Sequence, residues 1–206
     1  MADRFKAVLL FGMPGSGKGT QGKMLGAVPG FYHLATGDIF RSLDRESDLG
    51  RLFVQYSSKG ELVPDDVTIK VWKQHVDGLI ESNTYNPSRD MLLLDGMPRS
   101  LNQAEVIGQY IDVLQVVHLV AHDEDKMVER MRRRAEKEGR HDDAKVDVIR
   151  NRFSVYRNET QPVLDHYGSE LVSEIDAIDT PGRVLQQVLT AVLPVQEQHF
   201  GNALEA

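Results

Sequence analysis

A glycine-rich segment near the N-terminus constrains this chain more than any other feature of its sequence. Residues 12–20 read GMPGSGKGT, and they follow the apolar run Ala7–Phe11, which has the length of a buried parallel strand. Glycines let successive backbone N–H groups converge on one anion, and Lys18 adds a mobile positive charge. The spacing matches the G-x-x-x-x-G-K part of a phosphate-binding loop between a strand and a helix. The residues expected to contact nucleotide phosphates are Gly15, Ser16, Gly17, Lys18, Gly19 and Thr20.

The loop departs from the usual pattern at the residue after its lysine. Gly19 stands where a serine or threonine normally contacts Mg²⁺, and Thr20 follows one place later. We therefore expect the metal to be held largely by phosphates and waters. Asp95 follows a second apolar run, Leu92–Leu94, and in phosphate-loop proteins such an aspartate faces Mg²⁺ or a water bound to it. The alternative is that Asp95 caps the next turn, and the two roles are compatible.

The rest of the chain alternates short apolar runs with longer amphipathic stretches, which is typical of β-α units with a parallel sheet. Strands are expected over Ala7–Phe11, Met91–Asp95, Val116–Val120 and Leu171–Ile175, with a shorter one near Tyr32–Leu34. Helices are expected over Asp65–Ile80, Asp123–Arg134 and Ala144–Asn158, and after Pro181. The polar residues 135–143 predict an exposed loop, and the last dozen residues predict a frayed tail. No linker divides the chain, so the sequence predicts one α/β domain.

Composition excludes several classes of function. A net charge of −7 argues against general binding of nucleic acid, which needs a basic surface. The absence of cysteine excludes disulfides, thiolate zinc sites and a cysteine nucleophile. The apolar runs are far shorter than the roughly 20 residues of a membrane span, and the N-terminus makes a poor signal peptide. We therefore expect a cytoplasmic protein that binds neither nucleic acid nor a membrane.

Five motifs occur in series: GMPGSGKGTQ from Gly12, TGDIFR at Thr36–Arg41, GELVPD at Gly60–Asp65, DGMPRSLNQ at Asp95–Gln103 and GRHDD at Gly139–Asp143. In this order they resemble the nucleoside monophosphate kinases, and most closely the adenylate kinases of the short-lid type. The resemblance covers most of the chain. It implies a P-loop three-layer fold with a five-stranded parallel sheet flanked by helices. It also implies a single domain, 1–206, with a core of residues 1–34, 76–134 and 144–206, an AMP-binding segment at 35–75 and a short lid at 135–143.

The same resemblance implies a reaction. An adenylate kinase transfers the terminal phosphate of ATP to AMP with Mg²⁺, so the expected ligands are ATP, AMP and ADP, and the expected state is a monomer without zinc. A UMP/CMP kinase would apply the same chemistry to a different base, although Thr36 and Gln103 favour adenine. A different class, a nucleotide-binding module without transfer activity, needs only one nucleotide site. The arginines Arg99, Arg134 and Arg140 argue against that class.

The motifs of the family also assign the acceptor site. The residues that would hold AMP are Thr36, Arg41, Glu61, Leu62, Val63, Gly96, Met97, Pro98, Arg99, Gln103, Arg140 and Arg152. Among them, Gln103 contacts the adenine edge and Arg99 grips the acceptor phosphate. Met97 stands where the family usually has an aromatic residue, and we expect this flexible side chain to change acceptor affinity rather than the reaction.

Positive charge is concentrated in residues 130–140 of an otherwise acidic chain. Arg130 and Arg134 are four residues apart and share a helix face. The resemblance implies that both contact ATP. The expected catalytic residues are Lys18, Arg99, Arg134, Arg140 and Arg152. Planar guanidinium groups suit this role because they neutralise the charge that spreads over a phosphoryl group during transfer.

Two assignments remain as alternatives. The spacing after Asp143 is one residue longer than the family pattern, so Arg150 competes with Arg152 for the active-site position. Asp142 and Asp143 either bond to arginines of the lid or cap the following helix. None of the scattered histidines is assigned a role.

Overall fold

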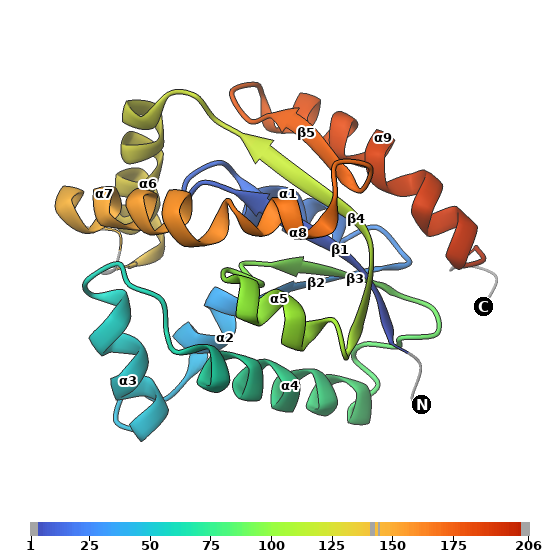
Figure 1. The fold of residues 1–206 in the computed structure, drawn as a ribbon, viewed down its shortest axis with the longest axis horizontal. Helices are drawn as coiled ribbons and strands as arrows, with labels where there is room; N and C mark the ends of the chain where they lie inside the picture. The colour runs from blue at the N-terminus through green and yellow to red at the C-terminus, as the bar shows by residue number, and fades with distance from the viewer. Residues whose placement is uncertain (1–3, 141–142, 144, 203–206) are drawn as a thin grey trace.

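The computed structural model describes residues 4–140, 143 and 145–202. They form three layers, in which a central sheet lies between helices on both faces (Figure 1). The sheet has five parallel strands in the order β2-β3-β1-β4-β5. The strands are β1 (Phe5–Gly12), β2 (Phe31–Ala35), β3 (Met91–Asp95), β4 (Ile111–Val120) and β5 (Val172–Asp176). The expected α/β fold with a five-stranded parallel sheet is confirmed, with β1 and β4 longer than expected.

The helices of the described residues surround this sheet. They are α1 (Lys18–Leu25), α2 (Thr36–Ser42), α3 (Asp48–Ser57), α4 (Asp65–Glu81), α5 (Leu101–Ile107), α6 (Glu124–Glu138), α7 (Val146–Val155), α8 (Val163–Tyr167) and α9 (Pro181–His199). A π-helical stretch, η2 (Tyr156–Thr160), follows α7, so the helix expected over Ala144–Asn158 is present beyond Ala144, which lies outside the described residues. None of the described helices is both long enough and apolar enough to cross a membrane.

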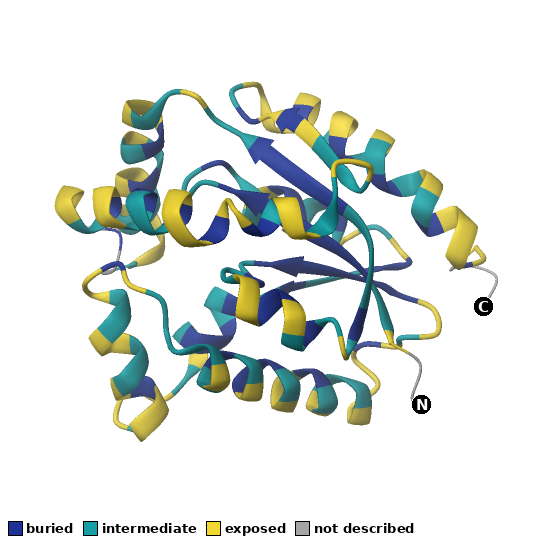
Figure 2. Cartoon of the chain, in the orientation of Figure 1, coloured by how far each residue is buried: buried dark blue, intermediate teal, exposed yellow. Residues whose placement is uncertain are grey.

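Alternating side chains of β1 divide the core between the two faces of the sheet. Leu9 belongs to a cluster that Trp72 of α4 and residues of α5 and α8 complete. Val8, the preceding residue, belongs to a second cluster with Val188 of α9 and a residue of α1. The central strands β1 and β3 are therefore buried on both sides, whereas the edge strand β5 is only partly buried. The exposed residues lie mainly on the outer surfaces of the helices (Figure 2).

The order of the strands determines where a ligand can bind. β1 lies between β3 and β4, and the chain passes through β2 and β3 on one side before it reaches β4 on the other. In open parallel sheets, ligands bind beyond the carboxyl ends of the strands at such a switch point. The arrowheads of β1, β3 and β4 point toward the end of the molecule where α6 and α7 lie (Figure 1). The glycine-rich segment after β1 opens onto this end.

Helix α6 shows that the expectation of a loop from residue 135 is wrong. The helix runs to Glu138 and ends where Gly139 adopts a left-handed conformation with φ 64°. Its last residues are polar because they form a solvated helix face, while Met127 and Met131 are buried further back. Polar composition alone therefore did not distinguish a helix from a loop. Residues 141 and 142 of the expected lid lie outside the described part of the chain.

The expectation of a frayed C-terminal tail is also wrong for residues up to 200. Helix α9 continues to His199, and Gln196 on its inner face is buried. Phe200 is 9% exposed and joins the core cluster that α9 forms with the sheet. The regularly spaced valines of α9 pack the helix against the sheet, and its last turn is therefore held in place as well.

Replacing Phe200 tests whether the end of the chain belongs to the core. We expect Phe200→Ala to lower the free energy of unfolding by about 3 kcal/mol, because a buried aromatic side chain is lost and a cavity remains. Urea denaturation followed by circular dichroism measures the change. Gln198→Ala, at an exposed position of the same helix, is the control and should change the value by less than about 0.5 kcal/mol. Equal effects of the two substitutions would contradict the packing described here.

Candidate active site

A cavity of about 730 Å³ opens at the carboxyl ends of β1 and β3. Its walls come from the glycine-rich loop, α2, residues 60–63, residues 95–99, α6 and α7. All residues that the sequence assigns to nucleotides, metal or catalysis line it. They are Gly15, Ser16, Gly17, Lys18, Gly19, Thr20, Thr36, Arg41, Glu61, Leu62, Val63, Asp95, Gly96, Met97, Pro98, Arg99, Gln103, Arg130, Arg134, Arg140 and Arg152. One hollow thus collects side chains from segments that are far apart in the chain.

The glycine-rich loop has the backbone conformation that its composition predicts. Gly12, Gly15 and Gly17 have φ values of 144°, 89° and 103°, a region that residues with a Cβ rarely adopt. A Cβ at Gly12 would lie 2.5 Å from the carbonyl oxygen of Leu119 on β4. The end of β1 therefore lies too close to β4 for any side chain at position 12. The loop that follows leads directly into α1, and the N-terminus of a helix after such a loop is an anion site.

The Lys18 ammonium folds back over this loop. Its Nζ donates hydrogen bonds to the carbonyl oxygens of Gly12 at 2.6 Å and Met13 at 3.3 Å. Burial, assisted by the charges of nearby arginines, lowers the pKa of Lys18 to about 8, although the Asp95 carboxylate opposes the shift. The lowered pKa means that the cavity does not fully compensate this positive charge. A bound anion such as a phosphate would stabilise it.

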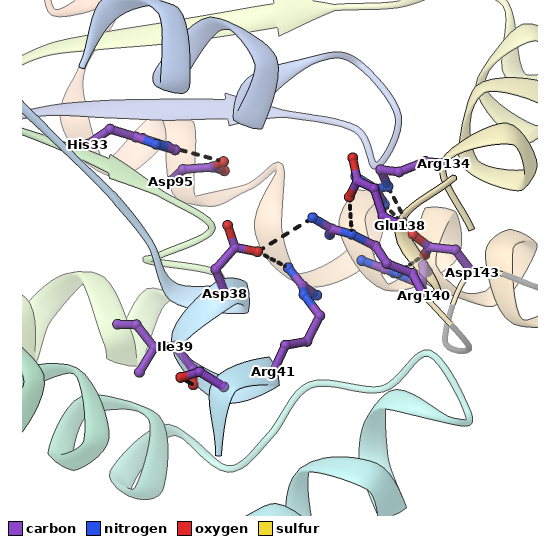
Figure 3. Close-up of polar contacts among 11 residues, drawn as sticks. His33, Asp38, Ile39, Arg41, Asp95, Arg134, Glu138, Arg140 and Asp143 are labelled. Atoms are coloured by element: carbon purple, nitrogen blue, oxygen red, sulfur yellow. Dashed lines mark hydrogen bonds and ion pairs between the residues drawn. The ribbon is translucent and has the colours of Figure 1, made fainter. Parts of the chain in front are cut away.

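Asp95 ends β3 beside the loop, with its Oδ2 atom 3.7 Å from Nε2 of His33 on β2 (Figure 3). Burial would raise the pKa of this carboxyl, but His33 and Lys18 outweigh that effect and hold the pKa below its usual range. The His33 ring lies against the helix after the loop, where a Cβ at Gly22 would collide with Nε2. A Cβ at Gly26 would be 2.7 Å from the Cβ of His33. The contact of His33 with Asp95 was not expected, because it depends on the pairing of β2 with β3.

The surroundings of Asp95 fit a magnesium ion that arrives with nucleotide phosphates. Mg²⁺ usually keeps several waters and takes one or two carboxylates together with phosphate oxygens. Asp95 offers one carboxylate. Gly19, in the first turn of α1, places no side chain beside it, and a Cβ at Gly19 would lie 3.5 Å from Oδ2 of Asp95. Within the described residues, no group of three or more His, Cys, Asp or Glu side chains could hold a metal ion.

Asp143 is fully buried and joins two arginines of the cavity wall. Arg134 of α6 donates from Nε to Oδ2 at 3.0 Å and from Nη2 to the same oxygen, and Arg152 of α7 donates from Nη1 to Oδ1. The N-cap of α7 is Lys145, so Asp143 does not cap this helix. Of the two interpretations of Asp143, pairing with arginines is confirmed. Asp142 lies outside the described residues.

Arg150 and Arg152 are two residues apart on α7 but have different surroundings. The side chain of Arg152 is 18% exposed and lines the cavity. That of Arg150 is 62% exposed and lies 3.9 Å from Asp125. The geometry therefore favours Arg152 over Arg150 as a nucleotide ligand. Arg130 also lines the cavity, where its Nη1 donates to the carbonyl oxygen of Ala177 at 3.1 Å.

Asp38 links α2 to the segment that follows α6. Its Oδ1 accepts from Nη2 of Arg41 at 2.8 Å and from Nη2 of Arg140 at 3.4 Å (Figure 3). Arg140 also donates from Nε to Glu138 at 2.6 Å. Partial burial would raise the pKa of Asp38, but the hydrogen bond from Arg41 and the charges of both arginines hold it below its usual range. The carboxylate was not expected as a site residue, and it draws two cavity arginines together.

Two hydroxyl groups of the cavity wall are buried without a hydrogen-bond partner among the described residues. They are Oγ of Ser16 in the loop and Oγ1 of Thr36 at the start of α2. Buried polar groups in proteins are almost always paired, and a ligand in the cavity would offer these two hydroxyls a partner. The two hydroxyls belong to separate segments: Ser16 lies on the side of the expected donor site, and Thr36 lies on the side of the expected acceptor site.

This combination of fold and site is that of a P-loop nucleotide kinase. The family model for adenylate kinase matches residues 10–172. The adenylate kinase of Nocardia farcinica is 39% identical over 190 residues, which cover 90% of this chain and 98% of that protein. The adenylate kinase of Thermus thermophilus is 34% identical over 194 residues, 91% of this chain and 97% of that protein. The chain belongs to the adenylate kinase family.

The site predicts an unusual titration for Lys18. We expect its ammonium to titrate near pH 8, because burial disfavours the charged form. Asp95→Asn removes the negative charge that supports the ammonium, so the pKa should fall further. NMR of the protein with isotopically labelled dimethyl-lysines follows the titration, and Asp66→Asn, at an exposed position of α4, is the control. A native Lys18 pKa near the ordinary 10.5 would contradict the environment described here.

Proposed function

We propose that this protein transfers the terminal phosphate of ATP to AMP and forms two molecules of ADP. The observation that carries the proposal is the convergence of cationic side chains from separate segments on one cavity beside the phosphate loop. These side chains are Lys18, Arg99, Arg134, Arg140 and Arg152. A protein that binds a single nucleotide needs the loop and its lysine, whereas arginines from further segments suit a second ligand that carries a phosphate. Membership of the adenylate kinase family supports the same pair of substrates.

We assign ATP to the side of the cavity that the loop forms. Its phosphates would be bound by the loop and the start of α1, through Gly15, Ser16, Gly17, Lys18, Gly19 and Thr20. Arg130 and Arg134 project from α6 into the same cavity and would contact the donor phosphates from the other side. The unpaired Ser16 hydroxyl supports this assignment, because a phosphate oxygen would give it a partner.

We assign AMP to the side formed by α2 and by the segments before α4 and α5. The residues proposed to hold it are Thr36, Arg41, Glu61, Leu62, Val63, Gly96, Met97, Pro98, Arg99, Gln103, Arg140 and Arg152. The apolar members suit a flat base, the arginines suit its phosphate, and Gln103 offers an amide to the base edge. The unpaired hydroxyl of Thr36 supports a ligand at this position.

The residues of the chain act mainly by position and charge. Transfer spreads negative charge over the moving phosphoryl group, and fixed guanidinium groups stabilise that charge. Lys18 would follow the donor phosphates, and Arg99 would hold the acceptor phosphate. Arg134, Arg140 and Arg152 would surround the group that moves. No general base of unusual strength is needed, because positioning supplies most of the acceleration.

The proposal also covers the magnesium ion, the exclusion of water from the site and the oligomeric state. Mg²⁺ bound with ATP neutralises phosphate charge, and Asp95 would hold it through a water molecule. The segments 35–75 and 135–143 would close over both nucleotides, since water in the site would otherwise take the phosphoryl group. We propose that the protein is a monomer, because the residues assigned to both substrates belong to a single chain. We also propose that it acts in the cytoplasm.

ADP formation tests the proposal directly. With Mg²⁺, ATP and AMP together should give two ADP for each ATP consumed, while ATP alone should give little. Lys18→Ala should lower kcat by roughly a hundredfold or more, because a charge on the phosphates is lost. Lys70→Ala, at an exposed position of α4, is the control and should act like the native protein. A folded native protein that forms no ADP, or that prefers UMP or CMP as acceptor, would refute the proposal.

Arg152 and Arg150 provide a matched pair of substitutions. Arg152→Ala should lower kcat by roughly a thousandfold, because a guanidinium group at the transferred phosphoryl group is lost. Arg150→Ala removes the same charge from the exposed face of α7 and should leave kcat close to the native value. Steady-state kinetics with ATP and AMP, together with thermal unfolding to verify the fold, measure both. Similar losses in the two variants would show that Arg152 acts only through the net charge of α7.

A further inference from the structure

Asp65 is the centre of a hydrogen-bond cluster next to the acceptor side of the cavity. It is the first residue of α4, and its three partners belong to α5 and the residue that caps it. Oδ1 accepts from Nε2 of Gln103 at 2.6 Å. Oδ2 accepts from Oγ of Ser100 at 2.8 Å and from Nδ2 of Asn102 at 2.9 Å. A carboxylate that receives three hydrogen bonds is held firmly in one place.

Gln103 is thereby held at both ends of its amide. Its Oε1 accepts from the backbone N–H of Arg99 at 2.8 Å, and its Nε2 donates to Asp65. Gln103 is 1% exposed and lines the cavity. If the amide turned over, its NH₂ group would meet the N–H of Arg99 and its oxygen would meet the carboxylate of Asp65. Both contacts would become repulsive, so the surroundings determine which end of the amide donates.

The amide retains hydrogen-bonding capacity for a ligand. A primary amide has two donor hydrogens and an oxygen with two lone pairs, and the contacts with Arg99 and Asp65 use one of each. One N–H and one lone pair have no partner among the residues that the structure describes, and their order is fixed. This order can match an edge on which a ring nitrogen accepts and a neighbouring amino group donates, as in adenine. It cannot at the same time match the reversed order of hypoxanthine, in which the ring N–H donates and the carbonyl accepts.

We infer that Asp65 is a positioning residue that makes the acceptor site select the adenine edge by fixing the orientation of Gln103. The inference rests on the proposed function, in which Gln103 contacts the acceptor base. Asp65 is absent from the cavity wall, so it acts through Gln103 and does not touch the nucleotide. Base selection then depends on a carboxylate that belongs to a different helix from the amide it orients.

Inosine monophosphate (IMP) is the probe that tests whether the acceptor site selects the adenine edge. It keeps the purine, the ribose and the phosphate of AMP and reverses both hydrogen bonds of the base edge. We expect the native protein to use AMP at least roughly a hundredfold better than IMP, measured as the ratio of kcat/KM values. Asp65→Asn should reduce this ratio roughly tenfold, because the amide can then turn over against the Arg99 N–H alone. The change should lie mainly in KM, since the transferred phosphoryl group keeps its ligands.

Two controls separate this effect from a general loss of structure. Asp66→Asn removes the neighbouring carboxylate from the same turn of α4, where the side chain is exposed, and should leave the ratio unchanged. In a Gln103→Ala background, Asp65→Asn should change the ratio by less than about twofold, because the group through which it acts is gone. If Asp65→Asn does not fold, Asp65→Ser takes its place. The AMP/IMP ratio of the native protein is itself a test that does not depend on the folding of any variant.

Three results would overturn the inference. They are a native ratio near one, a folded Asp65→Asn protein that loses activity on AMP and IMP equally, and an undiminished effect in the Gln103→Ala background. Failure of the proposed function looks different, since the native protein would then form no ADP from ATP and AMP. In that case the inference falls with it.

Discussion

The close approach of the end of β1 to β4 at Gly12 fixes the position of the whole site. Gly12 pairs in register with Leu119 of β4, and a Cβ at Gly12 would meet the carbonyl oxygen of that residue. On the other side of β1, Leu10 is in register with Asp95, so the loop and the carboxylate rise from adjacent strands of a buried sheet. Neither can shift without disturbing the core. The site therefore forms only where the cationic side chains of α6, α7 and the segment after β3 lie beside the loop. The positions of these side chains determine which ligands the site can bind.

Carboxylates control the placement of these cations. Asp143 holds Arg134 and Arg152, and Asp38 contacts Arg41 and Arg140. Each carboxylate reduces the repulsion between two positive groups that would otherwise separate. A guanidinium group has five N–H donors, so an arginine can keep its carboxylate and still bind a phosphate. The site can thus be organised before the nucleotides arrive, and little reorganisation is needed during transfer.

The sequence predicted those features that a local pattern specifies. The loop, Lys18 and Asp95 depend on short spacings after apolar runs, and a strand, a loop and a helix leave few alternatives for them. The partner of Asp95, by contrast, depends on the pairing of β2 with β3, and the contact of Gln103 with Asp65 spans 38 positions of the chain. Such contacts are properties of packing, which a single sequence does not display. The end of α6 was misjudged for a related reason, since a solvated helix face and a loop have the same polar composition.

The two kinds of ligand-binding group in this cavity differ in what a neighbouring carboxylate does for them. A guanidinium group only donates, so Asp143 sets the position of Arg134 and Arg152 without changing the kind of hydrogen bond they offer. An amide donates at one end and accepts at the other. Its orientation therefore determines which kind of hydrogen bond it offers at each place, even when its position is unchanged. The arginine side of the cavity can therefore tolerate small rearrangements and still attract negative charge. The side with Gln103, where we propose that the acceptor base binds, cannot, because turning this amide over exchanges its donor for its acceptor, and the cluster at Asp65 opposes that exchange.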